Sequence, residues 1–258
     1  MLLTFYKYQG TGNDFIILDN SQNDIYLDAK QIHHLCDRRF GIGADGLMLR
    51  NNKEGYDFEM IYYNADGNES SLCGNGGRCM VRFVYDLGLH KNKFRFLAID
   101  GEHEATIEDR DWVHLKMKDV IAIQKYNSDF IINTGSPHYV KSVSLLNDFD
   151  VVNKGKEIRY SDEFAEDGIN VNFVEENTKE LFVRTYERGV EDETLSCGTG
   201  VTAAALVFPH NDNGFNRIEI ETPGGHLAVE YDKTGEEKYE NIWLCGPAIF
   251  VFKGEIKI

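Results

Sequence analysis

The sequence predicts an α+β fold of two pseudo-symmetric domains, each a mostly antiparallel, barrel-like β-sheet wrapped around a central helix. Three observations predict it. The chain matches itself at an offset of about 123 residues, which indicates a duplicated unit. Its short segments rich in β-branched and aromatic residues are typical of strands. Each half also contains one apolar helical segment directly after a Cys-Gly-x-Gly motif.

Four short segments of the first half recur in the same order in the second half. Residues 11–17 match 134–140, 57–64 match 180–187, 73–76 match 197–200, and 101–103 match 224–226. Four matches in one order indicate two homologous domains rather than two unrelated β-rich halves. We expect an N-terminal domain at 1–120 and a C-terminal domain at 121–249, and the last residues, about 250–258, are candidates for a return to the first domain.

The first half contains the pattern of a sheet with one covering helix. The expected strands are residues 4–8, 14–19, 46–50, 57–63, 94–99 and 112–117. A helix is expected from Asp28, a favourable N-cap residue, to about Phe40. Its apolar side, formed by Ile32, Leu35 and Cys36, has the spacing of one helix face.

A second kind of helix follows each Cys-Gly-x-Gly motif. The first is expected at 78–87, with Gly88 as its C-cap, and the second at 201–208. The second segment is apolar on nearly every side, which is typical of a helix buried in a core. Strands wrapped around a central helix, once in each half, are the simplest architecture that satisfies this pattern.

Composition narrows the class of function. The 258 residues carry a formal net charge of −16, which argues against binding to nucleic acid or to an anionic membrane. We expect a small-molecule substrate and a cytoplasmic location, since the sequence has neither a signal peptide pattern nor an apolar run of roughly 20 residues. The five cysteines form no Cys-x-x-Cys pair, so no metal site is expected and the thiols should stay reduced.

Cys73 and Cys197 have the context of reactive cysteines. Each precedes a Gly-rich turn and a helix, so backbone N–H groups at the helix N-terminus can bind a carboxylate. The positive end of the helix dipole also stabilises a thiolate. The remaining cysteines stand in apolar segments and are expected to be buried structural residues; they are Cys36, Cys79 and Cys245.

A pair of thiols on opposite sides of one substrate carbon can invert its configuration. A thiolate removes the α-proton, and the opposite thiol returns a proton to the other face. Charge that develops beside the carboxylate would be stabilised by the two helix N-termini. This chemistry needs no cofactor.

The chain resembles the diaminopimelate epimerase family, and the resemblance runs from Gly10 to beyond Pro247. The motifs that carry it lie at residues 10–15, 41–45, 64–67, 72–78, 135–138, 187–189 and 193–200. The resemblance implies cofactor-independent conversion of LL- to meso-2,6-diaminopimelate, in lysine and peptidoglycan precursor synthesis, by a homodimer.

The same resemblance implies a role for each site residue. Cys73 and Cys197 would be the acid/base pair, and His138 and Glu187 would adjust the pKa values of the two thiols. Glu187 would also accept from a substrate ammonium, and Arg188 would pair with the distal carboxylate. The implied substrate-binding residues are Asn13, Asn64, Gly74, Asn75, Asn170, Glu187, Arg188, Gly198 and Thr199, with Ser136 as a further candidate.

Two positions depart from the family pattern. Gly46 stands where the family usually has Gln, and Ser136 stands where it usually has Asn. From the residues alone, Asn13 and Asn64 could instead be turn residues with left-handed backbone. Two alternative functions stay open: a related cysteine-pair racemase of another amino acid, such as proline, and a non-catalytic carboxylate-binding protein.

Overall fold

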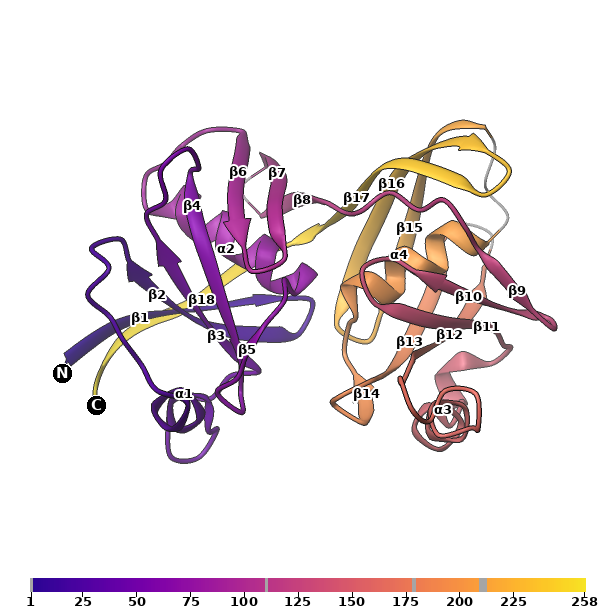
Figure 1. The fold of residues 1–258 in the computed structure, drawn as a ribbon, viewed down its shortest axis with the longest axis horizontal. Helices are drawn as coiled ribbons and strands as arrows, with labels where there is room; N and C mark the ends of the chain where they lie inside the picture. Colours follow the sequence, from indigo (N-terminus) through magenta and orange to yellow (C-terminus); the bar gives the residue numbers. More distant parts are fainter. Residues whose placement is uncertain (1, 110, 178–179, 209–212) are drawn as a thin grey trace. The chain divides into compact units, whose positions relative to one another are not determined.

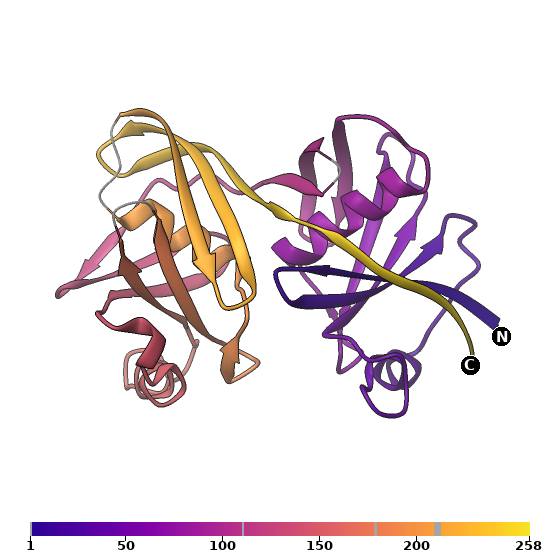
Figure 2. The same ribbon diagram turned by 180° about the vertical axis from the view of Figure 1, so that it is seen from behind.

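The structure is a computed structural model, and it describes residues 2–109, 111–177, 180–208 and 213–258. The chain folds into two compact units. The first consists of Met1–Leu115 with Gly246–Ile258, and the second is Lys116–Cys245. Each unit combines one sheet with helices (Figures 1 and 2).

The first unit is built from ten consecutive elements and one late strand. They are β1 (Leu2–Gly10), β2 (Asn13–Asn20), α1 (Ala29–Cys36), β3 (Gly46–Asn51), β4 (Phe58–Asn64), β5 (Glu69–Ser70), α2 (Gly74–Asp86), β6 (Lys93–Ala98), β7 (Gly101–Asp109), β8 (Trp112–Lys116) and β18 (Ile249–Lys257). The strand order is β18-β1-β2-β3-β4-β6-β7-β8, with β5 paired to β4. The last strand of the chain thus extends the sheet next to the first strand.

The second unit contains the remaining elements. They are β9 (Gln124–Tyr126), β10 (Asp129–Asn133), β11 (Pro137–Ser142), η1 (Leu146–Asp148), α3 (Val151–Arg159), β12 (Asn170–Glu176), β13 (Leu181–Glu187), β14 (Asp192–Thr194), α4 (Gly198–Val207), β15 (Gly214–Thr222), β16 (Gly225–Gly235) and β17 (Lys238–Pro247). The strand order is β9-β10-β11-β12-β13-β15-β16-β17, with β14 paired to β13.

The two units share one topology. The parallel pairs β2–β3 and β4–β6 of the first unit correspond to β11–β12 and β13–β15 of the second, and the other pairs named above are antiparallel in both. Strand β18 holds in the first unit the place that β9 holds in the second. The prediction of an α+β fold with an internal repeat is therefore confirmed.

Neither sheet is closed by the strand pairs that the described residues form. A closed barrel needs a hydrogen-bonded pair between its first and last strands, and the described residues form no such pair between β18 and β8 or between β9 and β17. Helix α2 instead contacts strands near both edges of the first sheet, namely β18, β1 and β7. The central helix thus fills the concave side of an open sheet, and the barrel-like description is corrected accordingly.

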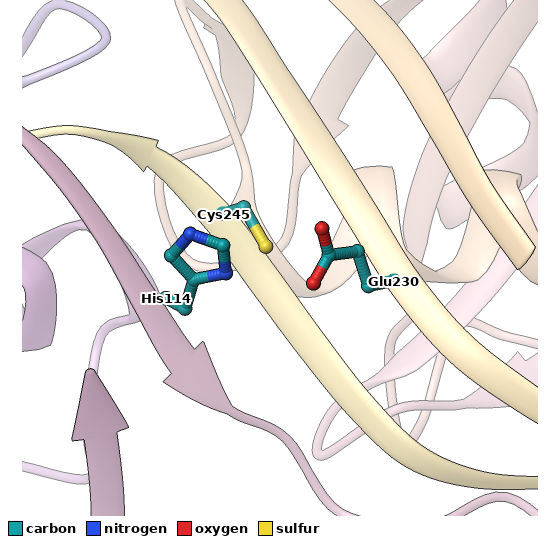
Figure 3. Close-up of side chains that lie close together, drawn as sticks. All are labelled: His114, Glu230 and Cys245. Carbon is teal, nitrogen blue, oxygen red and sulfur yellow. The ribbon is translucent and has the colours of Figure 1, made fainter. Parts of the chain in front are cut away.

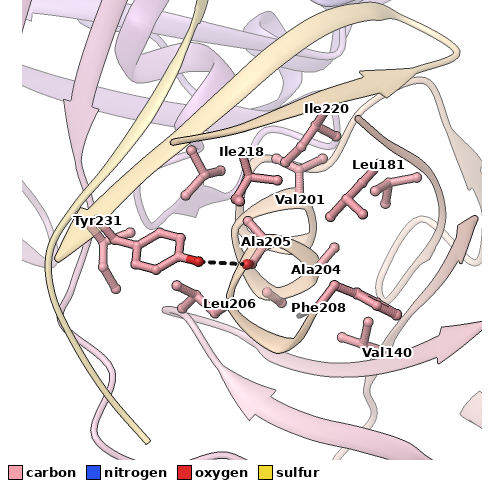
Figure 4. Close-up of a cluster of buried hydrophobic side chains, with 14 of the residues drawn as sticks. Val140, Leu181, Val201, Ala204, Ala205, Leu206, Phe208, Ile218, Ile220 and Tyr231 are labelled. Carbon is pink, nitrogen blue, oxygen red and sulfur yellow. Dashed lines mark hydrogen bonds between the residues drawn. The ribbon is translucent and has the colours of Figure 1, made fainter. Parts of the chain in front are cut away.

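Helix α4 is the centre of the second core (Figure 4). It contacts β10, β11, β12, β13, β15 and β16, and all but two of its ten residues are buried. Val201, Ala204 and Ala205 pack in a cluster that includes Ile220 and Tyr231. The Tyr231 hydroxyl donates to the Ala205 carbonyl over 3.4 Å, so the one polar atom of this ring is satisfied within the core. Packing in this core holds the N-terminus of α4 in place against the sheet.

The predicted helix starting at Asp28 is shorter than expected. Asp28 caps α1 and forms a capping box with Gln31, as its residue type favours. The helix ends at Cys36, because the Asp37 carboxylate accepts hydrogen bonds from the backbone N–H groups of Arg39 and Phe40, each over 2.7 Å. The predicted end at Phe40 is wrong, and the Phe40 side chain is 79% exposed.

Both central helices begin earlier than predicted. Helix α2 starts at Gly74 instead of residue 78, and α4 starts at Gly198 instead of residue 201. The Gly-rich residues are therefore the first helical turn and not a loop before it. Helix α2 has Leu87 as its C-cap, and Gly88 follows with a φ of 106°, one position after its predicted role. Among the described residues, no helix is long and apolar enough to cross a membrane.

Candidate active site

Cys73 is the N-cap residue of α2. Its backbone is extended, with φ −85° and ψ 125°, and its carbonyl accepts the first helical hydrogen bond from Gly77 over 2.7 Å. The N–H groups of Gly74 and Asn75 therefore point out of the helix N-terminus beside the thiol. A carboxylate or a thiolate at this place is favoured by the helix dipole.

The Asn13 amide lies against the Cys73 thiol. Its Oδ1 is 3.5 Å from Cys73 Sγ and 3.4 Å from Asn75 Nδ2. Its Nδ2 donates to the Asp45 carboxylate, which also accepts from the guanidinium of Arg38 over 2.7 Å. The amide oxygen thus faces the thiol because the amide nitrogen is held on its other side.

A buried arginine fixes Asn75. Arg78 is fully buried, and its Nη2 donates to Asn75 Oδ1 over 2.9 Å. Because the amide oxygen of Asn75 accepts from this arginine, its nitrogen is directed to Asn13. The small residue at Gly10 permits this packing, since a Cβ there would lie 3.3 Å from the Asn75 carbonyl oxygen and 3.4 Å from Arg78 Nη2.

Asp14, which follows Asn13 in the chain, is held by an ionic cluster with Lys7 and Arg38. Asp14 pairs with Lys7 over 2.7 Å and with Arg38 over 2.6 Å. Burial of the Asp14 carboxyl opposes its ionisation, but the hydrogen bonds from Arg38 and Lys7 outweigh it and lower its pKa to about 2. The carboxylate is therefore charged at neutral pH and anchors the start of β2.

Gly46, one of the two departures from the family pattern, has a structural explanation. A Cβ at Gly46 would lie 2.5 Å from the Tyr62 ring and 2.6 Å from the Tyr63 carbonyl oxygen, so this place has no room for a side chain. Gly46 pairs with Asn64, whose exposed side chain stands at the end of β4. Asn13 and Asn64 are absent from the positive-φ residues, so the interpretation of both as left-handed turn residues is wrong.

Cys197 repeats the arrangement at the N-cap of α4. Its backbone is extended, with φ −115° and ψ 111°, and its carbonyl accepts from Val201 over 2.9 Å. Cys197 as a whole residue is 8% exposed, and its thiol lies 3.6 Å from the Thr199 hydroxyl. The first turn is fixed from outside the helix, because the Thr134 hydroxyl donates to the Thr199 carbonyl over 2.8 Å. The N–H groups of Gly198 and Thr199 therefore point out of the N-terminus of α4, as those of Gly74 and Asn75 do in α2.

Ser136, Asn170 and Arg188 form a chain of contacts next to this helix. Asn170 Nδ2 donates to the Ser136 hydroxyl over 2.9 Å, and its Oδ1 accepts from the Arg188 backbone N–H over 2.9 Å. The exposed Arg188 side chain donates to the Asp167 carbonyl over 2.9 Å. Ser136 thus holds Asn170 through one hydrogen bond, where an Asn side chain would offer two groups.

His138 and Glu187 occupy different environments. His138 is fully buried on β11, and burial, with a contribution from the positive charge of Arg188, lowers its pKa to about 3. The imidazole is therefore neutral. Glu187 ends β13 and accepts from the Thr194 hydroxyl over 2.9 Å.

The other three cysteines are buried, as predicted. Burial raises the pKa of Cys36 to about 11 and that of Cys79 to about 12, so both stay protonated thiols.

Figure 3 shows Cys245, which lies on β17 beside β16, the strand that carries Glu230. His114, drawn in the same view, belongs to the first unit, and its Nε2 is 3.5 Å from a Glu108 carboxylate oxygen.

The structure brings most predicted site residues together within their own unit. In the first, Asn13 contacts both Cys73 and Asn75. Asn64 makes neither of these contacts among the interactions of the described residues. Sequence reasoning missed the residues that orient them, namely Asp14, Arg38, Asp45, Arg78, Thr134 and Asn172. Asp14 and Asp45 lie inside two of the motifs that carry the family resemblance, 10–15 and 41–45. Polar residues in such Gly-rich motifs could have been identified from the sequence as candidates for orienting the site residues.

Comparison with known proteins adds independent information. The family model described as "Diaminopimelate epimerase" matches residues 5–122 and 130–251. The chain is 50% identical over 260 residues to a diaminopimelate epimerase of Flavobacterium psychrophilum, which covers 98% of this chain and 100% of that protein. It is 40% identical over 261 residues to one of Chlorobaculum tepidum, covering 96% and 99%.

Solved structures share the fold at low sequence identity. A Bacillus anthracis phenazine biosynthesis protein of the PhzF family has a TM-score of 0.80 at 13% identity, with full coverage of both chains. A hydroxyproline epimerase from Agrobacterium vitis has a TM-score of 0.71 at 14% identity, covering 99% of this chain and 92% of that one. These likenesses concern the fold alone, whereas the family model and the sequence relatives span nearly the whole chain. The chain therefore belongs to the diaminopimelate epimerase family.

Proposed function

We propose that this chain interconverts LL- and meso-2,6-diaminopimelate without a cofactor, and that Cys73 and Cys197 are its acid/base pair. One thiolate removes the α-proton, and the other thiol delivers a proton to the opposite face, so one C–H bond breaks and another forms with inversion. The reverse reaction exchanges the two roles. Family membership and the duplicated cysteine at a helix N-cap support this proposal.

The duplicated helix N-cap is the observation that carries the mechanism. Each cysteine has an extended backbone and is followed by helical N–H groups that can bind the reacting carboxylate, through Gly74 and Asn75 in one unit and Gly198 and Thr199 in the other. Negative charge that develops on the carboxylate in the transition state is stabilised by preorganised donors of this kind.

The substrate's second amino-acid group needs its own partners. In this proposal Asn13, Asn64 and Asn170 line the substrate, Arg188 binds the distal carboxylate, and Glu187 accepts from an ammonium. Glu187 and His138 also tune the thiols. The distal contacts separate the proposal from a proline-type racemase, because proline has no second carboxylate. Arg188→Met should therefore raise KM for diaminopimelate far more than it lowers kcat.

Isotope exchange tests the two-cysteine mechanism. LL-diaminopimelate is incubated in deuterated water, and the α-deuterium of each epimer is followed by NMR. The wild type should label both epimers, whereas Cys73→Ala and Cys197→Ala should each abolish inversion. Each variant retains one thiol, so any residual exchange should label one epimer only, and a different one in each variant.

The matched control is Cys36→Ala, which removes a thiol that is buried in the core of the first unit. It should retain epimerisation. Full epimerase activity in Cys73→Ala and Cys197→Ala would contradict the mechanism, and exchange with proline but not with diaminopimelate would favour the racemase. Binding of diaminopimelate without any exchange would favour the carboxylate-binding protein.

The proposal includes a homodimer in the cytoplasm. Four consecutive apolar residues of β18, at positions 249–252, are each 41–50% exposed, and such a run on an edge strand supports association. Light scattering after size exclusion should give twice the chain mass, and Val251→Lys should shift it toward the monomer. A monomeric wild type would contradict this part of the proposal alone.

A further inference from the structure

His138 has one satisfied and one unsatisfied ring nitrogen. Its Nδ1 is 3.0 Å from Asn172 Nδ2. Its Nε2 has no hydrogen-bond partner among the described residues, although the whole side chain is buried. A buried polar atom without a partner destabilises the free protein. The unpaired Nε2 of His138 therefore points to a hydrogen-bond acceptor that is present when substrate is bound, which we call the loaded site.

The orientation of the Asn172 amide decides which nitrogen of the ring carries the hydrogen. Asn172 Nδ2 lies 3.1 Å from the Tyr139 carbonyl oxygen, which can only accept, and its Oδ1 accepts from the Thr185 hydroxyl over 2.9 Å. The amide nitrogen must therefore face Tyr139, and it faces His138 Nδ1 as well. In a neutral imidazole, an Nδ1 that accepts leaves the hydrogen on Nε2.

Both residues belong to the second half of the site. A Cβ at Gly200 would lie 2.2 Å from Asn172 Oδ1, so Asn172 packs against the first turn of α4. His138 is the register partner of Asn170 on the neighbouring strand. Arg188 is the charged group that acts on the ring among the described residues, and its charge, like burial, favours the neutral form.

We propose that His138 acts as a neutral hydrogen-bond donor through Nε2–H to an anionic acceptor in the loaded site, and that Asn172 is the positioning residue that fixes this tautomer. This inference rests on the proposed function for the identity of the reaction. It deepens the tuning role of His138, because an Nε2 that already carries hydrogen cannot accept a proton. The ring can stabilise a thiolate or a carboxylate, but it is not a general base.

The tautomer is tested without substrate, by ¹⁵N NMR of the histidine ring nitrogens in the full chain. The wild type should show an unprotonated Nδ1 and a protonated Nε2 from pH 5 to pH 9. Asn172→Asp should reverse this, because a carboxylate accepts from Nδ1–H. The control Thr222→Val removes a buried hydroxyl contact elsewhere in the second unit and should leave the tautomer unchanged. A wild-type ring protonated at Nδ1 would overturn the proposal, whether or not the chain epimerises diaminopimelate.

The pH profile tests what the donor does in the reaction. At pH 8, Asn172→Asp should lower kcat by about 100-fold, the range for loss of one preorganised donor. Activity should recover as the pH falls through the raised pKa of His138 in this variant, because an imidazolium carries hydrogen on both nitrogens. A general base would behave in the opposite way, so unchanged or increased activity at pH 8 would overturn the proposal.

A second pair of variants avoids dependence on the folding of Asn172→Asp. His138→Gln places an amide N–H near the position of Nε2 but cannot act as a base, whereas His138→Leu has neither property. We expect Gln to retain at least about 10-fold more activity than Leu. Equal loss in both variants would overturn the donor role.

The acceptor is identified by following the Nε2–H resonance. A shift on raising the pH of the free protein, lost in Cys73→Ala or in Cys197→Ala, would identify a thiolate. A shift that appears only on addition of diaminopimelate would identify the substrate carboxylate. No shift under either condition would contradict an anionic acceptor.

Discussion

Asn13 donates a hydrogen bond from its side-chain nitrogen to the Asp45 carboxylate, with 2.5 Å between Nδ2 and Oδ2. Because a carboxylate accepts and does not donate, this contact assigns the nitrogen and the oxygen of the amide. The oxygen is therefore presented to the Cys73 thiol at 3.5 Å. The exposed Asp45 carboxylate thus determines that Asn13 presents its oxygen, and not its nitrogen, to the Cys73 thiol.

Asp45→Asn should uncouple Asn13 from this orientation. An amide at residue 45 can present either its oxygen or its nitrogen, so Asn13 is free to turn its own nitrogen toward the thiol. We expect kcat to fall by about 10- to 100-fold, as small errors in positioning allow, with little change in the melting temperature because Asp45 is 43% exposed at its side chain. Steady-state kinetics and thermal unfolding measure both.

The control for Asp45→Asn is Asp19→Asn, which weakens a carboxylate–arginine pair of the same unit, Asp19–Arg50, at 3.3 Å. This variant should retain kcat. A wild-type kcat in Asp45→Asn would show that the Asn13 orientation does not depend on Asp45.

The repeat in the sequence was enough to predict the two units and their central helices. The matches around Cys73 and Cys197 identified equivalent positions, and the structure gives both cysteines the same N-cap conformation. The helix starts were missed because Gly has a low intrinsic helix propensity. At these two places, burial of Gly76 and Gly200 against the strands overrides that propensity.

Some orienting residues lay inside identified motifs, but their contacts could not be predicted, because each contact joins residues far apart in the chain. Asp45 reaches Asn13 across 32 positions, and Asn172 reaches His138 across 34. The pairing of β2 with β3 and of β11 with β12 in parallel creates both contacts. Helix α3 was also missed, since its apolar residues are few and it is largely exposed.

Restoring the family's usual residue at Gly46 should destabilise this chain. Gly46→Gln would place a Cβ 2.6 Å from the Tyr63 carbonyl oxygen, and a backbone atom of a central strand cannot move freely. Overpacking of this kind costs about 1–3 kcal/mol, and each kcal/mol lowers the melting temperature of a chain of this size by roughly 2–4 °C. Differential scanning calorimetry measures the shift.

Gly235→Ala is the matched control, because a Cβ there would meet only the Lys238 side chain, whose Cβ lies 3.3 Å away across the β16–β17 hairpin, and not a fixed backbone atom as at Gly46. Its melting temperature should stay close to that of the wild type. If Gly46→Gln were as stable as the wild type and gained activity, the space at residue 46 would not exclude a side chain. The difference from the family would then be the loss of the Gln side chain's function.

The five cysteines should differ strongly in reactivity. Cys73 is only partly buried, at the positive end of a helix, so it should be the first thiol alkylated by iodoacetamide at pH 8. Cys36 and Cys79 should resist, since both are buried and their pKa values are raised to about 11 and about 12. Peptide mass spectrometry after timed labelling measures each rate, and a denatured sample that labels all five is the control. Labelling of Cys79 as fast as Cys73 would refute the assignment of reactive and structural thiols.

The Asp14 cluster should make stability depend on pH in a defined window. The carboxyl has a pKa of about 2 in the folded chain against an ordinary value of 3.8, because hydrogen bonds from Arg38 and Lys7 outweigh the effect of burial. A lowered pKa in the folded state contributes stability above the unfolded pKa and loses it as the pH falls toward the folded pKa. The contribution is about 2 kcal/mol at pH 6 and about half of that at pH 3.

Urea unfolding of the wild type and of Asp14→Asn at pH 6 and pH 3 measures this dependence. The variant should be less stable at both values, and the difference in unfolding free energy should narrow by about 1 kcal/mol at pH 3. Acid effects on all other carboxyls cancel in that difference, because both proteins carry them. If the difference in unfolding free energy were the same at pH 6 and pH 3, Lys7 and Arg38 would not be keeping Asp14 ionised. Asp14 would then stabilise the start of β2 through packing and not through its charge.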